Sequence, residues 1–326
     1  MRRRDFFGAV SGMAATALVA RAQERVRRLG ALMNSEAEDP IAQSYVAAFR
    51  QGMQEFGWSE GRNLHVELRW GGTTPEIIRR HAVDLVALSP DIILAAGGPA
   101  VYALQRVTRT IPIVFAQSID PVGSAIVASL ARPRGNATGF TQFEYSLSSK
   151  WVELLKEIVP GARRLGVLRE AINPAGIGQW AIIQAAATAV GMEVTPIGVG
   201  NPRDIERDIA AFAQEPNGAL VVAVSSNAIR HRSAIIASAA QHRLAAVYPY
   251  QYFVAGGGLV SYGADLLGQY RRAASYVDRI LKGEAPSELP VQAPTRYELA
   301  VNLKTAKTLG LTIPPSVLAR VDEVIE

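Results

Sequence analysis

Hydrophobic residues follow two different periods along the chain, and the two patterns alternate. Residues 64–70 alternate apolar and polar side chains, which is typical of a half-buried β-strand. Residues 91–96 are almost uniformly apolar and end at two glycines, as expected for a fully buried strand. Residues 41–56 instead carry hydrophobic side chains at broadly helical spacing. The pattern therefore predicts strands and helices in turn.

This alternation runs through the chain twice. The first series covers residues 26–130 and closes with an expected helix over residues 121–130. The second series begins after residues 135–139 (Gly-Asn-Ala-Thr-Gly) and runs to Asp265. Such alternation favours parallel sheets with helices on both faces. We predict an α/β fold of two doubly wound parallel-sheet lobes joined by crossovers, a hinged clamshell that binds its ligand between the carboxyl ends of the sheets.

The segments after Asp265 set the expected lobe boundaries. A helical stretch over residues 266–281 and an alternating stretch over residues 297–303 fit neither series, so we expect them to cross between the lobes. The predicted N-terminal lobe comprises residues 23–141 and 262–288, and the predicted C-terminal lobe comprises residues 142–261 and 289–326.

The first 22 residues have the pattern of an export signal. A basic start with Arg2, Arg3 and Arg4 precedes an uncharged run over residues 8–20, and Ala20-Arg21-Ala22 is a small-x-small cleavage site. The apolar run is too short for a permanent membrane helix. We expect cleavage after Ala22 and a periplasmic protein without stable membrane insertion. Residues 3–7, which begin with the pair Arg3-Arg4, resemble a twin-arginine signal. An ordinary Sec leader is the alternative.

Composition and charge narrow the function classes. The chain has 326 residues, of which 49% are hydrophobic and 19% charged, which suits a globular protein large enough for two lobes. The absence of cysteine excludes disulfides, thiolate metal sites and a cysteine nucleophile. The net charge is +5, but residues 1–22 hold four arginines and one aspartate, which leaves +2 after cleavage. We therefore do not predict a nucleic-acid partner.

No motif of an enzyme or of a cofactor site is present in the sequence. The four histidines show no metal-binding spacing, and neither a Gly-x-Ser-x-Gly elbow nor a P-loop occurs. The three glycines at 256–258 precede a predicted strand, whereas a dinucleotide fingerprint follows one. We predict no enzyme, no cofactor and no metal. A cofactor-free isomerase of similar fold and a repressor with a DNA-binding headpiece are the alternatives.

A set of short motifs carries a family resemblance. The tail over residues 297–315 (YELAVNLKTAKTLGLTIPP) is joined in the same order by segments at 52–61, 90–93, 111–115, 120–123 and 135–139. Together they resemble the ABC transporter substrate-binding family that includes the tryptophan/tyrosine-binding (TrpX-like) proteins. The resemblance implies a type I periplasmic-binding fold, a small-molecule ligand that is amino-acid-like or aromatic, and ABC permease subunits as partners. A ligand-sensing receptor for a signalling partner is the alternative.

Turns at the ends of first-lobe strands supply candidate ligand contacts. Gly97, Gly98 and Pro99 open a helix whose main-chain N–H groups suit a carboxylate. The resemblance implies a threonine where Gly98 stands, so one hydroxyl contact is missing. Asp120 caps a helix in our preferred interpretation and contacts the ligand in the alternative. The further first-lobe candidates are Asn34, Ser35, Gln117 and Ser118.

The second lobe supplies matching candidates. Ser225, Ser226 and Asn227 follow a strand, and the resemblance implies an aspartate where Ser226 stands, so a charge that could bind an amino group is absent. Tyr248 and Tyr250 belong to an aromatic segment that could form one wall of the site or pack in the core. The remaining candidates are Arg169, which could hold a carboxylate, and Asn173 and Asp265.

Overall fold

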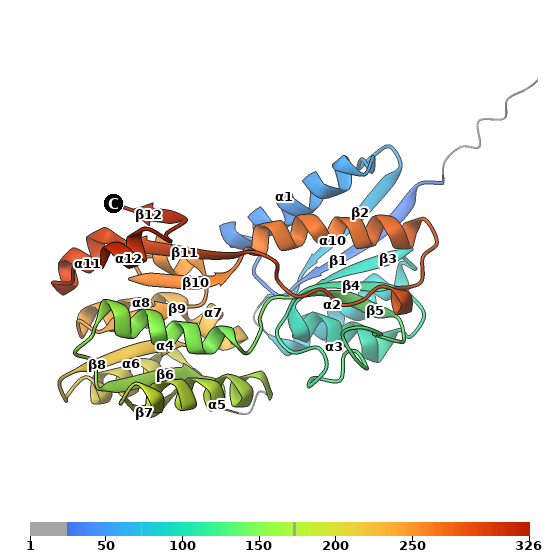
Figure 1. The fold of residues 1–326 in the computed structure, drawn as a ribbon. Coiled ribbons are helices and arrows are strands. Elements are labelled where there is room, and N and C mark those ends of the chain that lie inside the picture. The colour runs from blue at the N-terminus through green and yellow to red at the C-terminus, as the bar shows by residue number, and fades with distance from the viewer. Residues whose placement is uncertain (1–24, 73, 172–173) are drawn as a thin grey trace, which may run out of the picture.

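The computed structural model describes residues 25–72, 74–171 and 174–326. The expected export signal, its cleavage site and Asn173 lie outside these residues. Within the described residues the strands form two sheets, each in its own lobe, and the lobes lie side by side (Figure 1). The predicted α/β fold of two parallel-sheet lobes joined by crossovers is confirmed.

The first lobe is a parallel sheet between two helical layers. Its strand order is β2-β1-β3-β4-β5. Helices α1 and α10 pack together on one face, and α2 and α3 pack together on the other. The elements are β1 (Arg27–Met33), α1 (Pro40–Glu55), β2 (Leu64–Trp70), α2 (Pro75–Ala87), β3 (Ile92–Ala96), α3 (Gly97–Val107), β4 (Ile113–Ser118), β5 (Ala137–Thr141) and α10 (Leu266–Leu281).

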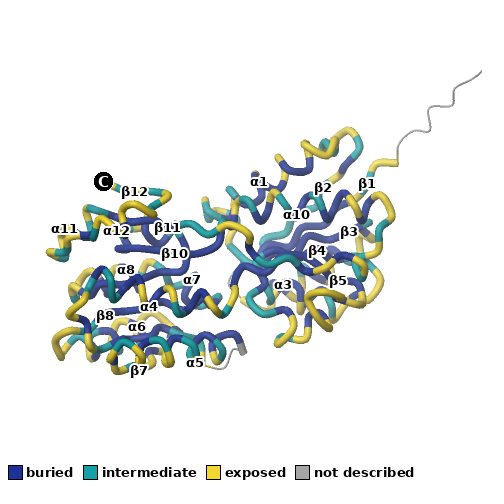
Figure 2. The backbone as a smooth tube through the Cα atoms, viewed as in Figure 1, coloured by how far each residue is buried: buried dark blue, intermediate teal, exposed yellow. Residues whose placement is uncertain are grey.

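Strand β3 shows why this sheet needs two covers. Ile92, Leu94 and Ala96 belong to the hydrophobic cluster beneath α1 and α10, whereas Ile93 and Ala95 belong to the cluster beneath α2 and α3. Successive side chains of a strand point to opposite faces, so a uniformly apolar strand buries both. Figure 2 shows the resulting buried backbone through the centre of each lobe.

The second lobe repeats the plan with a mixed sheet. Its strand order is β12-β11-β10-β9-β8-β6-β7. The elements are α4 (Leu147–Ile158), β6 (Arg164–Arg169), α5 (Pro174–Ala189), β7 (Glu193–Gly198), α6 (Pro202–Phe212), β8 (Gly218–Val222), α7 (Ser226–Arg230), α8 (Arg232–Gln241), β9 (Ala245–Tyr248), α9 (Gln251–Ala255), β10 (Val260–Ala264), β11 (Tyr297–Asn302), α11 (Leu303–Leu309), α12 (Pro315–Leu318) and β12 (Glu323–Ile325).

Strand β11 departs from the expected all-parallel sheets. It runs antiparallel to β10, with Ala264 opposite Tyr297. The chain leaves the second lobe at the end of β10 and re-enters beside the same point, so the returning strand runs in the opposite direction.

The prediction of a helix over residues 121–130 was also wrong, because this segment forms turns. Asp120 Oδ1 accepts a hydrogen bond from the Gly123 N–H at 2.8 Å and Ala125 has a φ of 54°, which together make turns.

The chain crosses between the lobes at residues 142–146, at Asp265 and at residues 293–296. Residues 262–264 pair in the second sheet, although the sequence placed them in the first lobe. Gln292 forms a bridge to Phe140 of the first lobe, although the sequence placed residues 289–292 in the second. A short 3-10 helix, η1 (Pro286–Glu288), precedes this last crossover.

Local sequence signals explain where helices α1 and α10 begin. Asp39 is the N-cap of α1, accepts a hydrogen bond from the Ile41 N–H, and is followed by proline at the first helical position. Asp265 is the N-cap of α10, where its side chain accepts a hydrogen bond from the Gly268 N–H.

Among the described residues, no helix has both the length and the apolarity that a membrane span requires.

Candidate functional site

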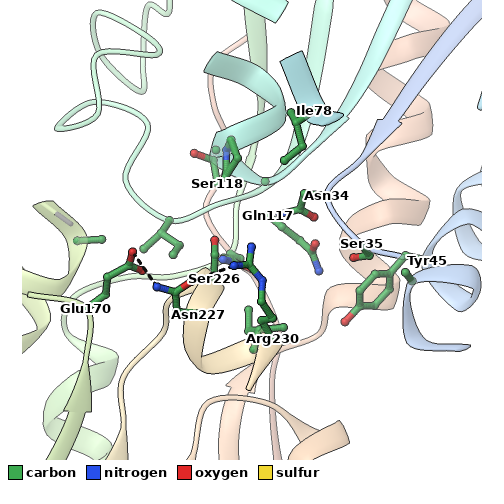
Figure 3. A pocket seen from close by; sticks show the side chains of 18 of the residues that line it. Asn34, Ser35, Tyr45, Ile78, Gln117, Ser118, Glu170, Ser226, Asn227 and Arg230 are labelled. Carbon is green, nitrogen blue, oxygen red and sulfur yellow. Dashed lines mark hydrogen bonds between the residues drawn. The ribbon is translucent and has the colours of Figure 1, made fainter. Parts of the chain in front are cut away.

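A pocket of about 690 Å³ lies between the two lobes. Its wall includes the turns after β1, β3 and β4 of the first lobe and after β6 and β8 of the second, so the carboxyl ends of both sheets meet there. Figure 3 shows Asn34 and Gln117 from one lobe facing Arg230 from the other. The predicted residues that line the pocket are Asn34, Ser35, Gly97, Gly98, Pro99, Gln117, Ser118, Asp120, Ser226 and Asn227.

The first turn of α3 is built from main chain alone. Gly97 has a φ of 76°, and a Cβ there would lie 2.5 Å from Nδ2 of Asn34. Ala96 at the N-cap position offers no side-chain hydrogen bond to the helix. Gly98 has open space around it, with no atom within 4 Å of the position that a Cβ would occupy. The helix therefore presents its N-terminal dipole and N–H groups to the pocket without a side-chain cap.

Gln117 holds the turn after β4 in an unusual conformation. Its φ is 59°, in the left-handed region that non-glycine residues rarely adopt. Two residues of α10 stabilise it: the Gln117 N–H donates to Gln269 Oε1 at 3.1 Å, and the Tyr270 hydroxyl donates to Gln117 Oε1 at 3.0 Å. Tyr45 stacks on Tyr270 with ring centroids 4.8 Å apart. The crossover helix thus supports two pocket residues, Gln117 and Tyr45.

Burial shapes the chemistry of the Tyr45 phenol. Desolvation raises the pKa of Tyr45, and the negative charge of Asp39 raises it further. The phenol therefore stays protonated at every physiological pH and acts in the pocket as a hydrogen-bonding hydroxyl and an aromatic face.

Asp120 lies in the pocket wall and also has a structural task. Its Oδ1 accepts from the Gly123 N–H, and its Oδ2 accepts from the Tyr145 hydroxyl at 2.8 Å. Burial first, and then the hydrogen bond to Asp120, raise the pKa of Tyr145. Because Tyr145 lies in a crossover segment, this bond ties the first lobe to the hinge. The prediction that Asp120 caps a helix was wrong, because its hydrogen bond from the Gly123 N–H closes a turn instead.

The N-terminus of α7 forms part of the second-lobe wall of the pocket. The Ser225 hydroxyl accepts from the Ala228 N–H, which makes Ser225 a buried N-cap outside the pocket wall. Ser226 and Asn227 then face the pocket. Asn227 Nδ2 donates to Glu170 Oε1 at 3.4 Å, and Arg230 Nη1 donates to Asn227 Oδ1 at 3.4 Å (Figure 3).

The structure places four other predicted contacts away from the pocket wall. Tyr248 is packed in the core against Phe253, with ring centroids 5.2 Å apart. Tyr250 lies behind Tyr252, on which it stacks at 5.5 Å, and Tyr252 is the ring that lines the pocket. Where an aromatic segment enters a helix, only some of its rings point toward the pocket. The sequence alone does not reveal which rings these are.

The side chains of Arg169 and Asp265 contact neighbouring residues of the protein instead of lining the pocket. The guanidinium of Arg169 lies 4.9 Å from the ring centre of Trp180, a cation–π arrangement within the second lobe. Asp265 accepts from the Gly268 N–H as the cap of α10. Both residues end or follow strands as predicted, but their side chains are used for local packing and capping.

Sequence reasoning missed most pocket residues that helices contribute. Gln142 is a missed residue that the strand-end argument could have found, since it directly follows β5. Its Oε1 is buried, and no partner for it lies among the described residues. The missed polar and aromatic residues of the wall are Glu36, Asp39, Tyr45, Tyr102, Ser124, Gln142, Glu170, Arg230, Arg232 and Tyr252.

Two charged side chains of the wall form an ion pair across the cleft. Arg232 of the second lobe lies 3.4 Å from Oδ2 of Asp39 in the first lobe. Among the described residues, no group of three or more potential ligands could hold a metal ion. The wall offers a ligand hydrogen-bonding side chains, aromatic faces and the N-terminus of α3.

These features define a two-lobed solute-binding protein, and comparison with known proteins agrees. The sequence model of the ABC transporter substrate binding protein family matches residues 36–325. The chain belongs to this family, as its motifs predicted, and its role is that of a solute-binding protein.

Known proteins of similar sequence or fold align with most of the chain. A tyrosine-binding protein of Clostridioides difficile (strain R20291) is 22% identical over 275 residues, which are 84% of this chain and 79% of that protein. A conserved domain protein from Vibrio cholerae has a TM-score of 0.85 at 27% identity, covering 92% of this chain and all of that one. An ABC domain from Streptococcus pneumoniae in complex with L-Trp has a TM-score of 0.84 at 23% identity, covering 92% and 99%.

Proposed function

We propose that this protein is the periplasmic component of an ABC uptake system. It closes on a small molecule in the interlobe pocket, releases that molecule unchanged to the permease subunits, and has no catalytic role. The observation that carries this proposal is the convergence of Gly98, Gln117, Ser226 and Asn227, from two lobes, on one pocket of about 690 Å³. A ligand that touches both walls favours closure, because only the closed form offers both sets of contacts.

The chemistry of the wall favours a ligand with a carboxylate and a flat or apolar part. The uncapped first turn of α3 attracts an anionic group. Tyr45 and Tyr252 supply aromatic surface on opposite lobes. A tyrosine-binding relative and an L-Trp complex of similar fold are in keeping with such a ligand. Gly98 and Ser226 differ from the residues that the family resemblance implies, so we propose a related ligand and not the same one.

Export is part of the proposal and rests on residues 1–22. Their basic start, short apolar run and Ala20-Arg21-Ala22 site are those of a cleaved leader. Mass spectrometry of the protein from a periplasmic extract should show Gln23 as the first residue. Replacement of Arg3 and Arg4 by lysine should retain the protein in the cytoplasm if the twin-arginine route is used. Normal export of this lysine variant would instead identify a Sec leader.

A thermal-shift screen of the chain from Gln23 onward tests solute binding. The compounds are amino acids, aromatic carboxylic acids, nucleosides and sugars, and one that binds only the folded protein raises the melting temperature. Gly98→Leu should abolish the shift by filling the pocket, because the space beside Gly98 is open. Gly161→Leu is the matched control, since Gly161 also has open space but lies outside the pocket.

The outcomes of the screen are distinct. A shift that Gly98→Leu removes and Gly161→Leu keeps supports binding in the pocket. A shift that both variants keep contradicts this location. Recovery of the compound unchanged after incubation, measured by mass spectrometry, supports a carrier, and its conversion would contradict one.

A further inference from the structure

One charged contact joins the two lobes away from the crossovers. Among contacts between described residues (25–72, 74–171 and 174–326), the side-chain bonds that connect the lobes outside the crossover segments are those from Arg232 to Asp39. Arg232 Nη2 lies 3.4 Å from Oδ2 and 3.5 Å from Oδ1 of Asp39. Both residues line the pocket. The pair therefore spans the cleft where the lobes would have to separate.

Each partner is also anchored to its own lobe. Asp39 caps α1 by accepting from the Ile41 N–H at 3.0 Å. Arg232 opens α8 and donates through Nη1 to the Ile229 carbonyl at 3.3 Å. Their side chains are 20% and 26% exposed. Because neither side chain can leave its lobe while keeping these bonds, lobe opening must break the ion pair.

We propose that the Asp39–Arg232 pair is an interlobe latch that stabilises the closed arrangement before a ligand arrives. This inference rests on the proposed function only in assuming that the lobes open and close. A latch that raises the closed fraction of the empty protein reduces the free energy that the ligand must supply for closure, so the latch raises the apparent affinity. For a partly exposed ion pair, its loss should shift the open–closed equilibrium about fivefold toward open.

The chain is well suited to a direct distance measurement. It contains no cysteine, so Arg106→Cys and Ala185→Cys provide the only thiols for spin labels. These exposed positions lie on α3 and α5. Both helices begin at the pocket, from opposite lobes, through Gly97 and Ala175. The separation of the labels therefore reports opening of the cleft in the ligand-free protein.

Two conservative variants remove the charges with little other change. Asp39→Asn retains a side chain that caps helices as well as aspartate does, and Arg232→Gln retains a polar chain. In the doubly labelled protein, each variant should raise the ratio of the long-distance to the short-distance population about fivefold, and the double variant should raise this ratio no further than either single one. Arg207→Gln is the control, because it breaks ion pairs within α6 that do not cross the cleft.

Salt gives a second and independent measurement. In about 1 M NaCl the screening length is about 3 Å, so the native pair weakens and the distance distribution should move toward that of the variants. The double variant should not respond. The proposal is overturned if Asp39→Asn and Arg232→Gln leave the distances unchanged, or if their effects add in full. No ligand is used, so failure of the latch appears here and failure of solute binding appears in the thermal-shift screen.

Discussion

Alanine at two adjacent glycines of the pocket should have opposite effects on stability. Gly97 has a φ of 76°, and its Cβ would lie 2.5 Å from Asn34 Nδ2. Left-handed backbone costs an alanine about 1–2 kcal/mol, and the displacement of Asn34 adds to this cost. Gly98 has no positive φ and no atom near its Cβ position. Gly98→Ala should therefore gain up to about 1 kcal/mol, because it restricts the unfolded chain.

The free energies of unfolding of the two variants should differ by about 2–3 kcal/mol, with Gly97→Ala the weaker protein. This difference is at least about thirtyfold in the unfolding equilibrium. Urea unfolding followed by tryptophan fluorescence measures it, provided that the slope with urea is the same for both variants. An equal loss for Gly97→Ala and Gly98→Ala would refute the assignment of different backbone requirements to the two positions.

Three further predictions concern the hinge, pH and the first sheet. Tyr145→Phe removes the hydrogen bond to Asp120 and should lower the free energy of unfolding by about 1 kcal/mol, measured in urea; an unchanged midpoint would contradict its role. Burial first, and then the charge of Arg230, lower the pKa of His231. The unfolded chain therefore binds more protons below about pH 6.5, stability should fall as the pH drops from there, and His231→Gln should reduce this slope in melting curves between about pH 5 and pH 7. Gly139→Ala would place a Cβ 2.0 Å from the Phe115 carbonyl oxygen and should cost about 3 kcal/mol or more, whereas Gly161→Ala, with open space, should keep the melting temperature.

The fold was predictable because its signals are local. Buried parallel strands such as β3 are uniformly apolar, and helices such as α2 start at recognisable caps, here Thr74 followed by proline. The failures arise where tertiary structure decides. The helix expected over residues 121–130 yields to the turn that Asp120 and Ala125 impose. The direction of β11 depends on where the chain re-enters the second lobe, which no local pattern encodes.

The candidate site divides in the same way. Residues at strand ends, such as Asn34, Ser118 and Ser226, were predicted because parallel strands bring their carboxyl ends to one edge. Residues on helices, such as Arg232 and Tyr252, were missed because their direction depends on how the second lobe packs against the first. Tyr248 was predicted from its neighbours in sequence, and the packing of Phe253 draws it into the core instead.

The return of α10 to the first lobe has a consequence for how the chain folds. Helix α10 packs on α1 and supplies Gln269 and Tyr270 to the turn after β4, yet more than a hundred residues of the second lobe separate it from β5. The second sheet in turn is incomplete until β11 and β12 have been made. The ribosome must therefore synthesise α10 before the first hydrophobic core can be completed, and β11 and β12 before the second can. Such long-range closure makes folding slow, and a nascent or truncated chain exposes apolar surface in both halves at once.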